Sequence, residues 1–346
     1  MEFKCFSDWN KIPQNNHSLF LQAEKDSLFF SREWFENLTS TAFESEQKLL
    51  IACVVDAEDI LAIIPIIVSP GKEWTSLSHR YSSLYSILVA KDNQQEILNC
   101  LAQGLKQLPF EYLSLDPVAD NDPTLNALQQ AMEACGFSCY RTFRFVNWFH
   151  RLNGQSFKDY MNARPSRVRN TIERKHRKLK REQTFEIRLY TEPNDMDQAL
   201  SEYHELYKSS WKAQEQFKGL VAGLCDRFTR KGWTRLGVLY INGQPAAAHL
   251  WFVVHKNASI FRLVYDQNWK QHSPGSILMR AMLEHVIDID KVEEIDFLTG
   301  NERYKQDWMS ESRERKSLIC VNKEAVSTKE KESVFHKLIS YFRKSK

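Results

Sequence analysis

The residue types best suited to bind and react with a ligand gather between Tyr265 and Trp308. Ser273, Pro274, Gly275 and Ser276 are typical of a helix start. Ser can cap the first turn, Pro fits it, and Gly lets a bulky group approach the backbone N–H groups. Such a helix start attracts anions, because its N–H groups and its dipole point toward the ligand. The sequence therefore predicts an anion site here, suited to a pyrophosphate.

Three polar side chains follow this helix. Asp296 ends a predicted buried strand, where an unpaired carboxylate is costly, so we expect it to pair with Lys305 or Arg262. The alternative is that burial raises its pKa and makes it a base. Tyr304 and Lys305 lie in a predicted loop after the strand, where open α/β sheets bind ligands. Lys305 could neutralise an oxyanion or bind a phosphate, and Tyr304 could protonate a leaving thiolate; a solvated lysine is the alternative.

A histidine lies in the apolar strand predicted at residues 244–254. His249 shares a face with Ala247, Trp251 and Val253 by strict alternation. Its reference pKa near neutrality suits a general base for an amine acceptor. A buried structural histidine is the alternative.

Basic residues concentrate in one segment, residues 164–181. It holds nine Lys or Arg and one acid, a local charge of +8 in a chain of net charge +3, so the remainder carries −5. The pattern predicts a helix whose exposed basic face binds tRNA, an acidic carrier protein or the phosphates of a large donor, and a merely solvated face is the alternative. The candidate contacts on this helix are Arg167, Arg169, Arg174, Arg177 and Lys178.

The elements that position these residues form an α/β pattern. Strands at 48–56 and 59–68 read as a hairpin, and the turn signal at Asn153–Gly154 indicates a domain boundary. The second half offers helices and strands at 157–161, 166–181, 184–190, 195–211, 220–230, 235–241, 244–254, 258–266, 274–289 and 293–298. Mixed sheets flanked by helices are expected in both halves.

Length and composition indicate how many domains the chain has and which classes of protein are excluded. A chain of 346 residues fits about two domains. No secretory signal is apparent, and the longest apolar run, residues 60–68, is too short to cross a bilayer, so we expect a soluble, cytoplasmic protein without an integral membrane segment. Seven scattered cysteines predict neither a disulfide framework nor a metal site.

Several motifs together resemble a known superfamily. They are Arg167 and Arg169 with RKHRKL (174–179), GQPAAAHLWF (243–252), YD (265–266), SPG (273–275) and DFLTGNERYKQDW (296–308). With these motifs the chain resembles the GNAT acyltransferases over about residues 151–320. The likeness is to the CelD-like acetyltransferase domain, which is related to the Fem-type aminoacyl transferases of peptidoglycan synthesis.

The resemblance implies two tandem GNAT-like domains, residues 1–153 and 154–322. The apolar pattern separately predicts an amphipathic helix at 323–346. It implies a thioester donor, acyl-CoA or an acyl carrier protein, and no metal. The strand at 258–266 would offer backbone N–H groups to the acyl carbonyl. No nucleophilic side chain is then required, which agrees with the absence of GxSxG, HExxH and Walker motifs. Donor contacts would be Tyr265, Ser273, Gly275 and Ser276, and substrate contacts Arg262, Asp266 and Trp308.

The chain departs from the common GNAT phosphate loop, since only Gly275 with Ser273 and Ser276 remains of its small residues. A carrier protein, a longer acyl-CoA or an aminoacyl-tRNA therefore stays open as donor. The expected function is N-acyl transfer to the amine of a sugar or amino-acid-like acceptor, in envelope or exopolysaccharide assembly. The alternatives are a Fem-like aminoacyl-tRNA-dependent transferase and a non-catalytic adaptor of a polysaccharide synthase complex. We expect an apolar stripe at 334–342 to pack on the body of the protein, and attachment to a membrane surface or a synthase complex is the alternative.

Overall fold

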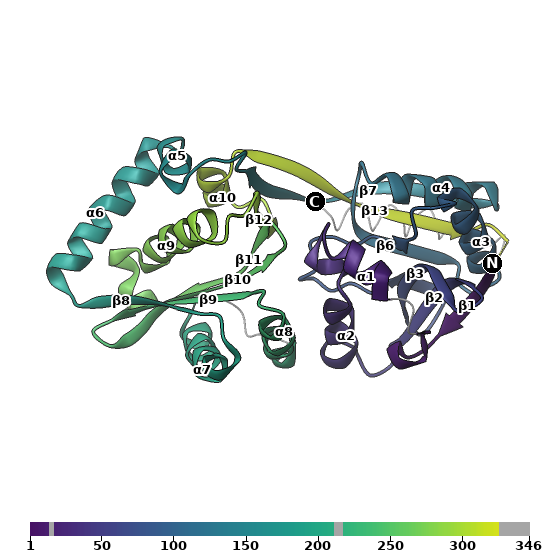
Figure 1. Cartoon of the computed structure of the whole chain (residues 1–346), viewed down its shortest axis with the longest axis horizontal. Coiled ribbons are helices and arrows are strands. Elements are labelled where there is room, and N and C mark those ends of the chain that lie inside the picture. The colour runs from purple at the N-terminus through teal and green to yellow at the C-terminus, as the bar shows by residue number, and fades with distance from the viewer. Residues whose placement is uncertain (14–16, 211–216, 325–346) are drawn as a thin grey trace. The chain divides into compact units, whose positions relative to one another are not determined.

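The computed structural model describes residues 1–13, 17–210 and 217–324. The described residues form two compact units, one within Met1–Val146 and Glu314–Lys346 and the other within Asn147–Arg313 (Figure 1). These divisions differ from the expected boundaries at 153/154 and 322/323. The reason is that two long strands, β7 (Phe137–Arg151) and β13 (Glu311–Asn322), each contribute residues to both units. The turn signal at Asn153–Gly154 indicates where a strand ends, but it does not indicate to which unit the residues of that strand belong.

The first unit is a mixed sheet with helices. Its strands follow the order β1-β2-β3-β4-β6-β13, in which only β4 and β6 pair in parallel among the described strands. The predicted hairpin is confirmed, with Asp56 opposite Asp59. The other elements are β1 (Glu2–Phe6), β2 (Lys48–Asp56), β3 (Asp59–Val68), β4 (Glu73–Ser76), β5 (Leu88–Val89), β6 (Tyr112–Ala119), α1 (His17–Ala23), α2 (Arg32–Thr41), α3 (Gln94–Lys106) and α4 (Pro123–Ala134).

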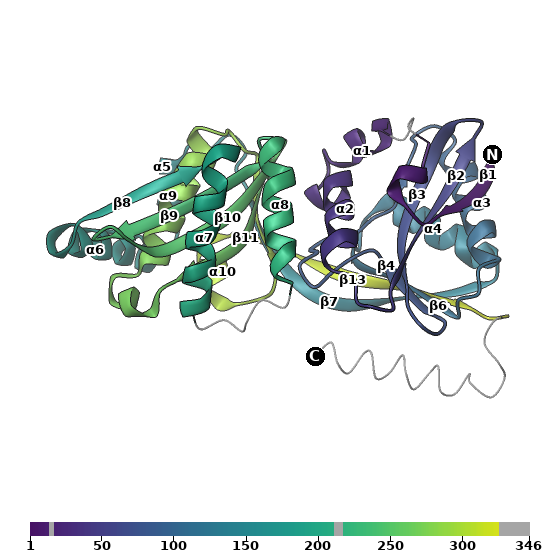
Figure 2. The same ribbon diagram turned by 90° about the horizontal axis from the view of Figure 1, so that it is seen from below.

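The second unit is a mixed sheet in the order β7-β12-β11-β10-β9-β8, with β11 and β12 parallel. Helices α7 and α8 lie on one face and α9 on the other (Figures 1 and 2). The elements are α5 (Phe157–Asn162), α6 (Ser166–Glu182), β8 (Phe185–Tyr190), α7 (Pro193–Ser209), α8 (Lys218–Arg230), β9 (Thr234–Ile241), β10 (Gln244–Val254), β11 (Asn257–Tyr265), α9 (Pro274–Asp288), β12 (Glu294–Thr299) and α10 (Arg303–Trp308).

The two units repeat one order of elements. In each unit, a strand and two helices come before three antiparallel strands. A helix follows the last of these three strands and leads to a further strand, which pairs in parallel with that last strand. The first unit uses β4, α3 and β6 for this β–α–β step, and the second uses β11, α9 and β12. The predicted mixed α/β architecture with two similar halves is thus confirmed.

Helix α9 packs closely on the sheet of the second unit. A Cβ atom at Gly237 would lie only 2.4 Å from the Met282 sulfur, so glycine at this position lets the helix approach β9. Ala247, Trp251 and Val253 of β10 belong to the same core as Leu278 of α9. The predicted face of β10 is therefore confirmed, and it is the face that α9 covers.

The predicted C-terminal helix at 323–346, with its apolar stripe at 334–342, lies almost entirely outside the described residues. Within the described ranges, no helix is long and apolar enough to cross a membrane.

Candidate active site

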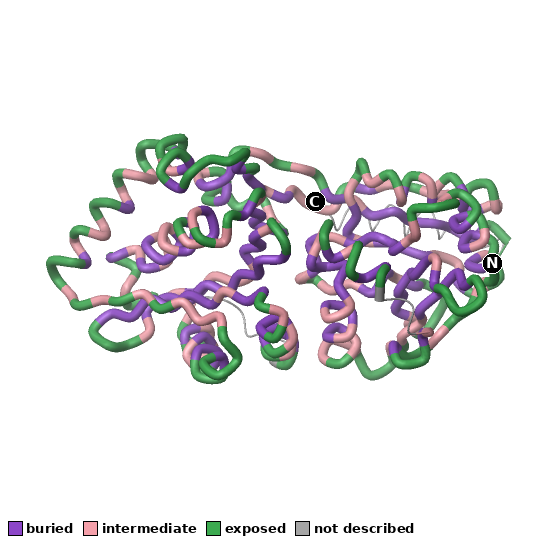
Figure 3. Tube along the Cα trace, in the orientation of Figure 1, coloured by how far each residue is buried: buried purple, intermediate pink, exposed green. Residues whose placement is uncertain are grey.

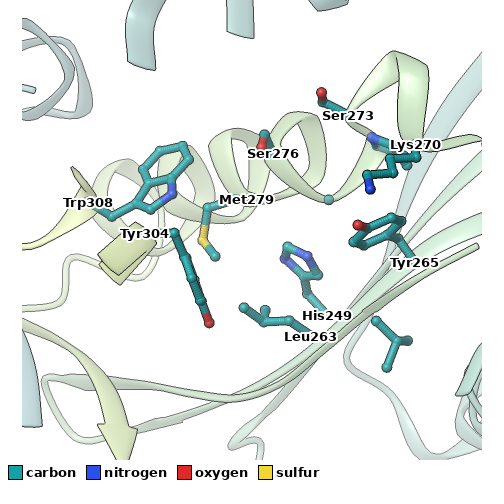
Figure 4. Close-up of a pocket in the computed structure, with 12 residues that line it drawn as sticks. His249, Leu263, Tyr265, Lys270, Ser273, Ser276, Met279, Tyr304 and Trp308 are labelled. Atoms are coloured by element: carbon teal, nitrogen blue, oxygen red, sulfur yellow. The ribbon is translucent and has the colours of Figure 1, made fainter. Parts of the chain in front are cut away.

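A pocket of about 470 Å³ opens between β10, β11 and the first two turns of α9, all within the second unit (Figure 4). In this view His249 lies in the middle, Lys270 and Tyr265 at one end, and Tyr304 and Trp308 at the other. The lining residues are His249, Leu263, Val264, Tyr265, Lys270, Ser273, Pro274, Gly275, Ser276, Met279, Tyr304 and Trp308.

The pocket forms where two parallel strands stop pairing. β11 pairs with β12 over Asn257–Ser259, and the pocket lies beyond that point, against Leu263, Val264 and Tyr265. Side chains alternate along a strand, so Val264, opposite Ala248, points to the other face from Leu263. Val264 therefore reaches the pocket through its backbone, which places main-chain polar groups of β11 beside any bound ligand.

The first unit has a pocket of about 410 Å³ of its own, lined in part by Gln94 at the start of α3 and Ala119 at the end of β6. Beyond the β4–β6 pairing, the Ser76 hydroxyl donates to the Asp116 carbonyl (2.8 Å) and accepts from the Asp116 N–H (3.0 Å). The buried Tyr85 then donates its backbone N–H to Pro117 (2.5 Å). These contacts join the ends of β4 and β6 beyond their pairing.

His249 is only 2% exposed and faces the start of α9. It stands opposite Gly237 on β9 and Leu263 on β11. A Cβ atom at Gly275 would lie 3.8 Å from His249 Nε2 and 3.6 Å from Tyr265 Cδ1. Glycine at position 275 thus keeps the space in front of the imidazole open.

The start of α9 differs from the prediction in one respect. Ser273 is the N-cap residue, but it has φ 53° and ψ 52° and makes no side-chain capping bond, so the predicted hydroxyl cap is wrong. A β-region backbone directs a capping side chain at the helix, and the left-handed conformation does not. Pro274 has no N–H, and the Ser276 and Ile277 N–H groups donate to the Ser273 carbonyl (3.1 and 3.2 Å). Gly275 therefore supplies the remaining backbone donor of the first turn.

Tyr304 and Trp308 lie on a short helix, α10, where the sequence predicted a loop. The Tyr304 ring packs edge-on against Phe297 at 5.6 Å and is 44% exposed. Desolvation, together with the negative charge of Glu302, raises the pKa of Tyr304, so its hydroxyl is protonated at neutral pH and can donate. The Trp308 carbonyl accepts from Tyr160 Oη (2.5 Å) and Arg164 Nη1 (2.6 Å), which fixes the end of α10.

Asp296 is paired, but with partners other than those predicted. One carboxylate oxygen accepts from Asn147 Nδ2 and from the Leu298 N–H, both at 2.5 Å, and the other accepts from Arg313 Nη2 at 2.6 Å. Lys305 and Arg262 are therefore wrong as partners. Arg313 lies on β13, an element that the sequence did not predict. With both oxygens engaged, Asp296 holds the strand ends in place and does not line the pocket.

Lys305 is 4% exposed and also lies outside the pocket lining. Its ammonium group donates to the carbonyls of Thr299 and Gly300 and pairs with Glu302 at 2.9 Å. Gly300 has φ 112°, a backbone conformation that favours glycine. The lysine thus closes the turn between β12 and α10.

Replacing Lys305 by Met should lower the free energy of unfolding by about 1–3 kcal/mol, because buried carbonyl acceptors lose a charged donor while the aliphatic stem remains. Chemical denaturation would measure this, with Lys291→Met at an exposed lysine as the matched control. A large fall in kcat with unchanged unfolding would instead assign the oxyanion role to Lys305.

Two other predicted contacts serve local structure. Arg262 stands opposite Leu250, and its guanidinium group lies 5.6 Å from the Phe261 ring centroid. Asp266 accepts from the Asn268 N–H (3.0 Å) and begins the 3-10 helix Gln267–His272. Neither residue lines the pocket.

The basic helix α6 rests on few buried residues, Ile172 and Leu179, and is mostly exposed or half-buried along its length (Figure 3). Arg167 pairs with Asp307, and Lys178 lies 3.8 Å from Glu182. Arg174 and Arg177 are exposed, and Arg169 is half-buried. None of these five lines the pocket, but α6 reaches its edge, because the Lys175 ammonium group donates to the Gln271 carbonyl of the 3-10 helix.

The structure thus gathers seven predicted residues around one pocket: His249, Tyr265, Ser273, Gly275, Ser276, Tyr304 and Trp308. It adds Lys270, which lies three residues before Ser273 and which no sequence motif singled out. Leu263 and Met279 are further additions, with no signal beyond apolar periodicity. In the described ranges, no three His, Cys, Asp or Glu side chains are grouped to hold a metal ion.

Comparisons with known proteins agree with this geometry. Residues 166–306 match the family described as acetyltransferase (GNAT) domain, whereas no curated protein sequence matches the chain. The crystal structure of FemX has a similar fold, at TM-score 0.65 and 10% identity, covering 93% of this chain and 98% of FemX. L-PGS from Bacillus licheniformis gives TM-score 0.53 at 9% identity, covering 90% of this chain and 96% of that chain. A tandem GNAT protein from the clavulanic acid biosynthesis pathway gives TM-score 0.52 at 12% identity, covering 94% and 100%. The chain therefore has the fold of a tandem GNAT protein, and residues 166–306 of its second unit match the acetyltransferase (GNAT) domain.

Proposed function

We propose that the second unit transfers an acyl group from a phosphopantetheine thioester to the amine of a sugar or amino-acid-like acceptor. The observation that carries this proposal is the position of His249, which is buried in a pocket at the start of α9 with its Nε2 facing Gly275. A base held beside a helix start, in a pocket lined by main-chain groups of β11, suits acyl transfer without a covalent intermediate.

Residues of the pocket can carry out each proton transfer that acyl transfer requires. The acceptor nitrogen attacks the acyl carbon, and His249 Nε2 takes the proton from the amine, directly or through one water. The carbonyl oxygen gains negative charge and faces the backbone of β11, where N–H donors stabilise an oxyanion. The carbon–sulfur bond then breaks, and the protonated Tyr304 hydroxyl donates to the leaving sulfur. His249 then releases its proton to solvent, and Tyr304 is re-protonated from solvent.

Acyl-CoA is the first donor to test, because acyl-CoA is the usual donor of GNAT domains. A carrier protein bearing the same thioester is the second, since the phosphopantetheine arm is common to both. The exposed Arg174 and Arg177 on α6 support one alternative, an aminoacyl-tRNA donor, because an unshielded basic helix can bind a nucleic-acid backbone. The acyltransferase domain argues against the non-catalytic adaptor.

A donor panel tests this function. The full chain is incubated with acetyl-CoA, longer acyl-CoA, acyl carrier protein thioesters or aminoacyl-tRNA, together with amino sugars and amino acids, and the products are identified by mass spectrometry. We expect an N-acylated product and free thiol with a thioester donor. Product with aminoacyl-tRNA alone would select the alternative, and no product with any donor would contradict acyl transfer by this unit.

A further inference from the structure

Two cysteine side chains meet on neighbouring strands of the first unit. Cys139 lies on β7 and Cys320 lies on β13, and these strands are neighbours in the sheet. The Cys139 thiol donates to the Cys320 sulfur, and the two sulfur atoms are 3.3 Å apart. The two residues are 181 positions apart in the chain, so only the fold brings them together. Neither lines the pocket of the second unit.

The backbone around the two thiols suits a covalent bond between them. Neighbouring strands lie about 4.8 Å apart, which is within the range of Cα separations that a disulfide spans. The sulfur atoms must approach each other by about 1.3 Å to reach the usual bond length. Rotation of the two side chains supplies a movement of this size and leaves the strands in place.

The two thiols differ in their exposure to solvent, and this difference sets the order in which they react. Cys139 is half-buried, whereas Cys320 is fully buried. The hydrogen bond from Cys139 and burial raise the pKa of the Cys320 thiol, and Glu133 of α4 raises it further, whereas Arg141 acts in the opposite direction. A small oxidant therefore reacts with Cys139 first, while Cys320 remains a thiol.

The position of the pair in the chain gives a bond between them a structural consequence. Cys139 precedes residues 147–313 and Cys320 follows them, so the bond closes a covalent loop that contains the second unit. β13 lies between β6 and β7 in the sheet, and the bond ties it to β7. The same strand carries Arg313, which pairs with Asp296 in the second unit. A covalent link at Cys320 therefore secures a strand that contributes to both units.

We propose that Cys139 and Cys320 form a reversible disulfide when the chain meets a low-molecular-weight disulfide such as oxidised glutathione. This site is independent of the proposed acyl transfer, because both cysteines lie in the first unit and outside the pocket of the second.

The reaction is a thiol–disulfide exchange in two steps. Cys139 loses its proton, and its sulfur attacks one sulfur of glutathione disulfide, whose S–S bond breaks and releases one glutathione, which takes up a proton. Cys139 then no longer donates to Cys320, which removes the largest effect that keeps Cys320 protonated. Cys320 loses its proton and attacks the Cys139 sulfur, and the second glutathione leaves and is protonated. Two protein thiols are thus oxidised, and one glutathione disulfide is reduced to two glutathione molecules.

Peptide mapping of the full chain after incubation with glutathione disulfide tests the pair. Under non-reducing conditions we expect the peptide that holds Cys139 to be linked to the peptide that holds Cys320, and dithiothreitol should separate them. In Cys320→Ala, Cys139 should instead retain bound glutathione, because no second thiol displaces it. Cys135→Ser, at another half-buried cysteine, is the matched control and should leave the linkage unchanged.

Thermal unfolding gives a second measurement. The linked protein should unfold about 10 °C above the reduced protein, because a bond across a long loop restricts the unfolded chain. Wild-type protein that yields no linked peptides, or that retains glutathione on Cys139 as Cys320→Ala does, would overturn the proposal. An equal shift in oxidised Cys139→Ser would assign the stabilisation to other thiols and overturn the structural role of this bond.

Discussion

His249→Gln is expected to lower kcat by about 10²–10⁴-fold, the usual contribution of a general base. Glutamine keeps a polar side chain of similar size at a position that is 2% exposed, but it cannot accept a proton at neutral pH. Steady-state kinetics with the active donor measures the effect, and thermal unfolding verifies the fold.

The matched control is His285→Gln, which changes a histidine on the last turn of α9, far from the Gly275 end. It should leave kcat unchanged. Wild-type turnover by His249→Gln would show that the buried imidazole is structural. A loss of stability without a loss of turnover per folded molecule would lead to the same conclusion.

Asp296→Ala is expected to reduce the free energy of unfolding by about 3 kcal/mol, because buried hydrogen-bond donors that now bond to its carboxylate would be left unsatisfied. Arg313 would keep its pairing with Glu294 at 2.8 Å, but Asn147 and the Leu298 N–H would lose their acceptor. Leu298 has φ 57°, so its strained backbone would also lose a bond that supports it. Urea denaturation measures the change.

Glu311→Ala provides the comparison. Glu311 pairs with Arg151 at 2.7 Å, but both side chains are more than a third exposed, so its removal should cost less than about 1 kcal/mol. Equal destabilisation by the two substitutions would contradict the role given to Asp296. Retained stability with lost turnover for Asp296→Ala would restore the alternative of a catalytic base.

Hydrophobic periodicity predicted most of the second unit. The meander at 235–266 and the helix at 274–289 were placed within one residue, because each buries one face and its apolar residues repeat at the period of the element. β13 was missed, since five of the six residues from Glu311 to Lys316 are charged and hide its buried positions. The loop predicted around Tyr304 is a helix of six residues, too short for a periodic signal.

The sequence by itself determined the family resemblance, the helix start at Ser273–Ser276 and the face of β10 that carries His249, because these depend on residues near one another in the chain. The tertiary structure decided which charges meet. It paired Asp296 with Arg313 across 17 residues and with Asn147 across 149, and it turned Lys305 toward the turn after β12. It also brought Lys270, Gly275, His249 and Tyr304 into one pocket. Pairing between strands sets these distances, and no local pattern of residue types encodes them.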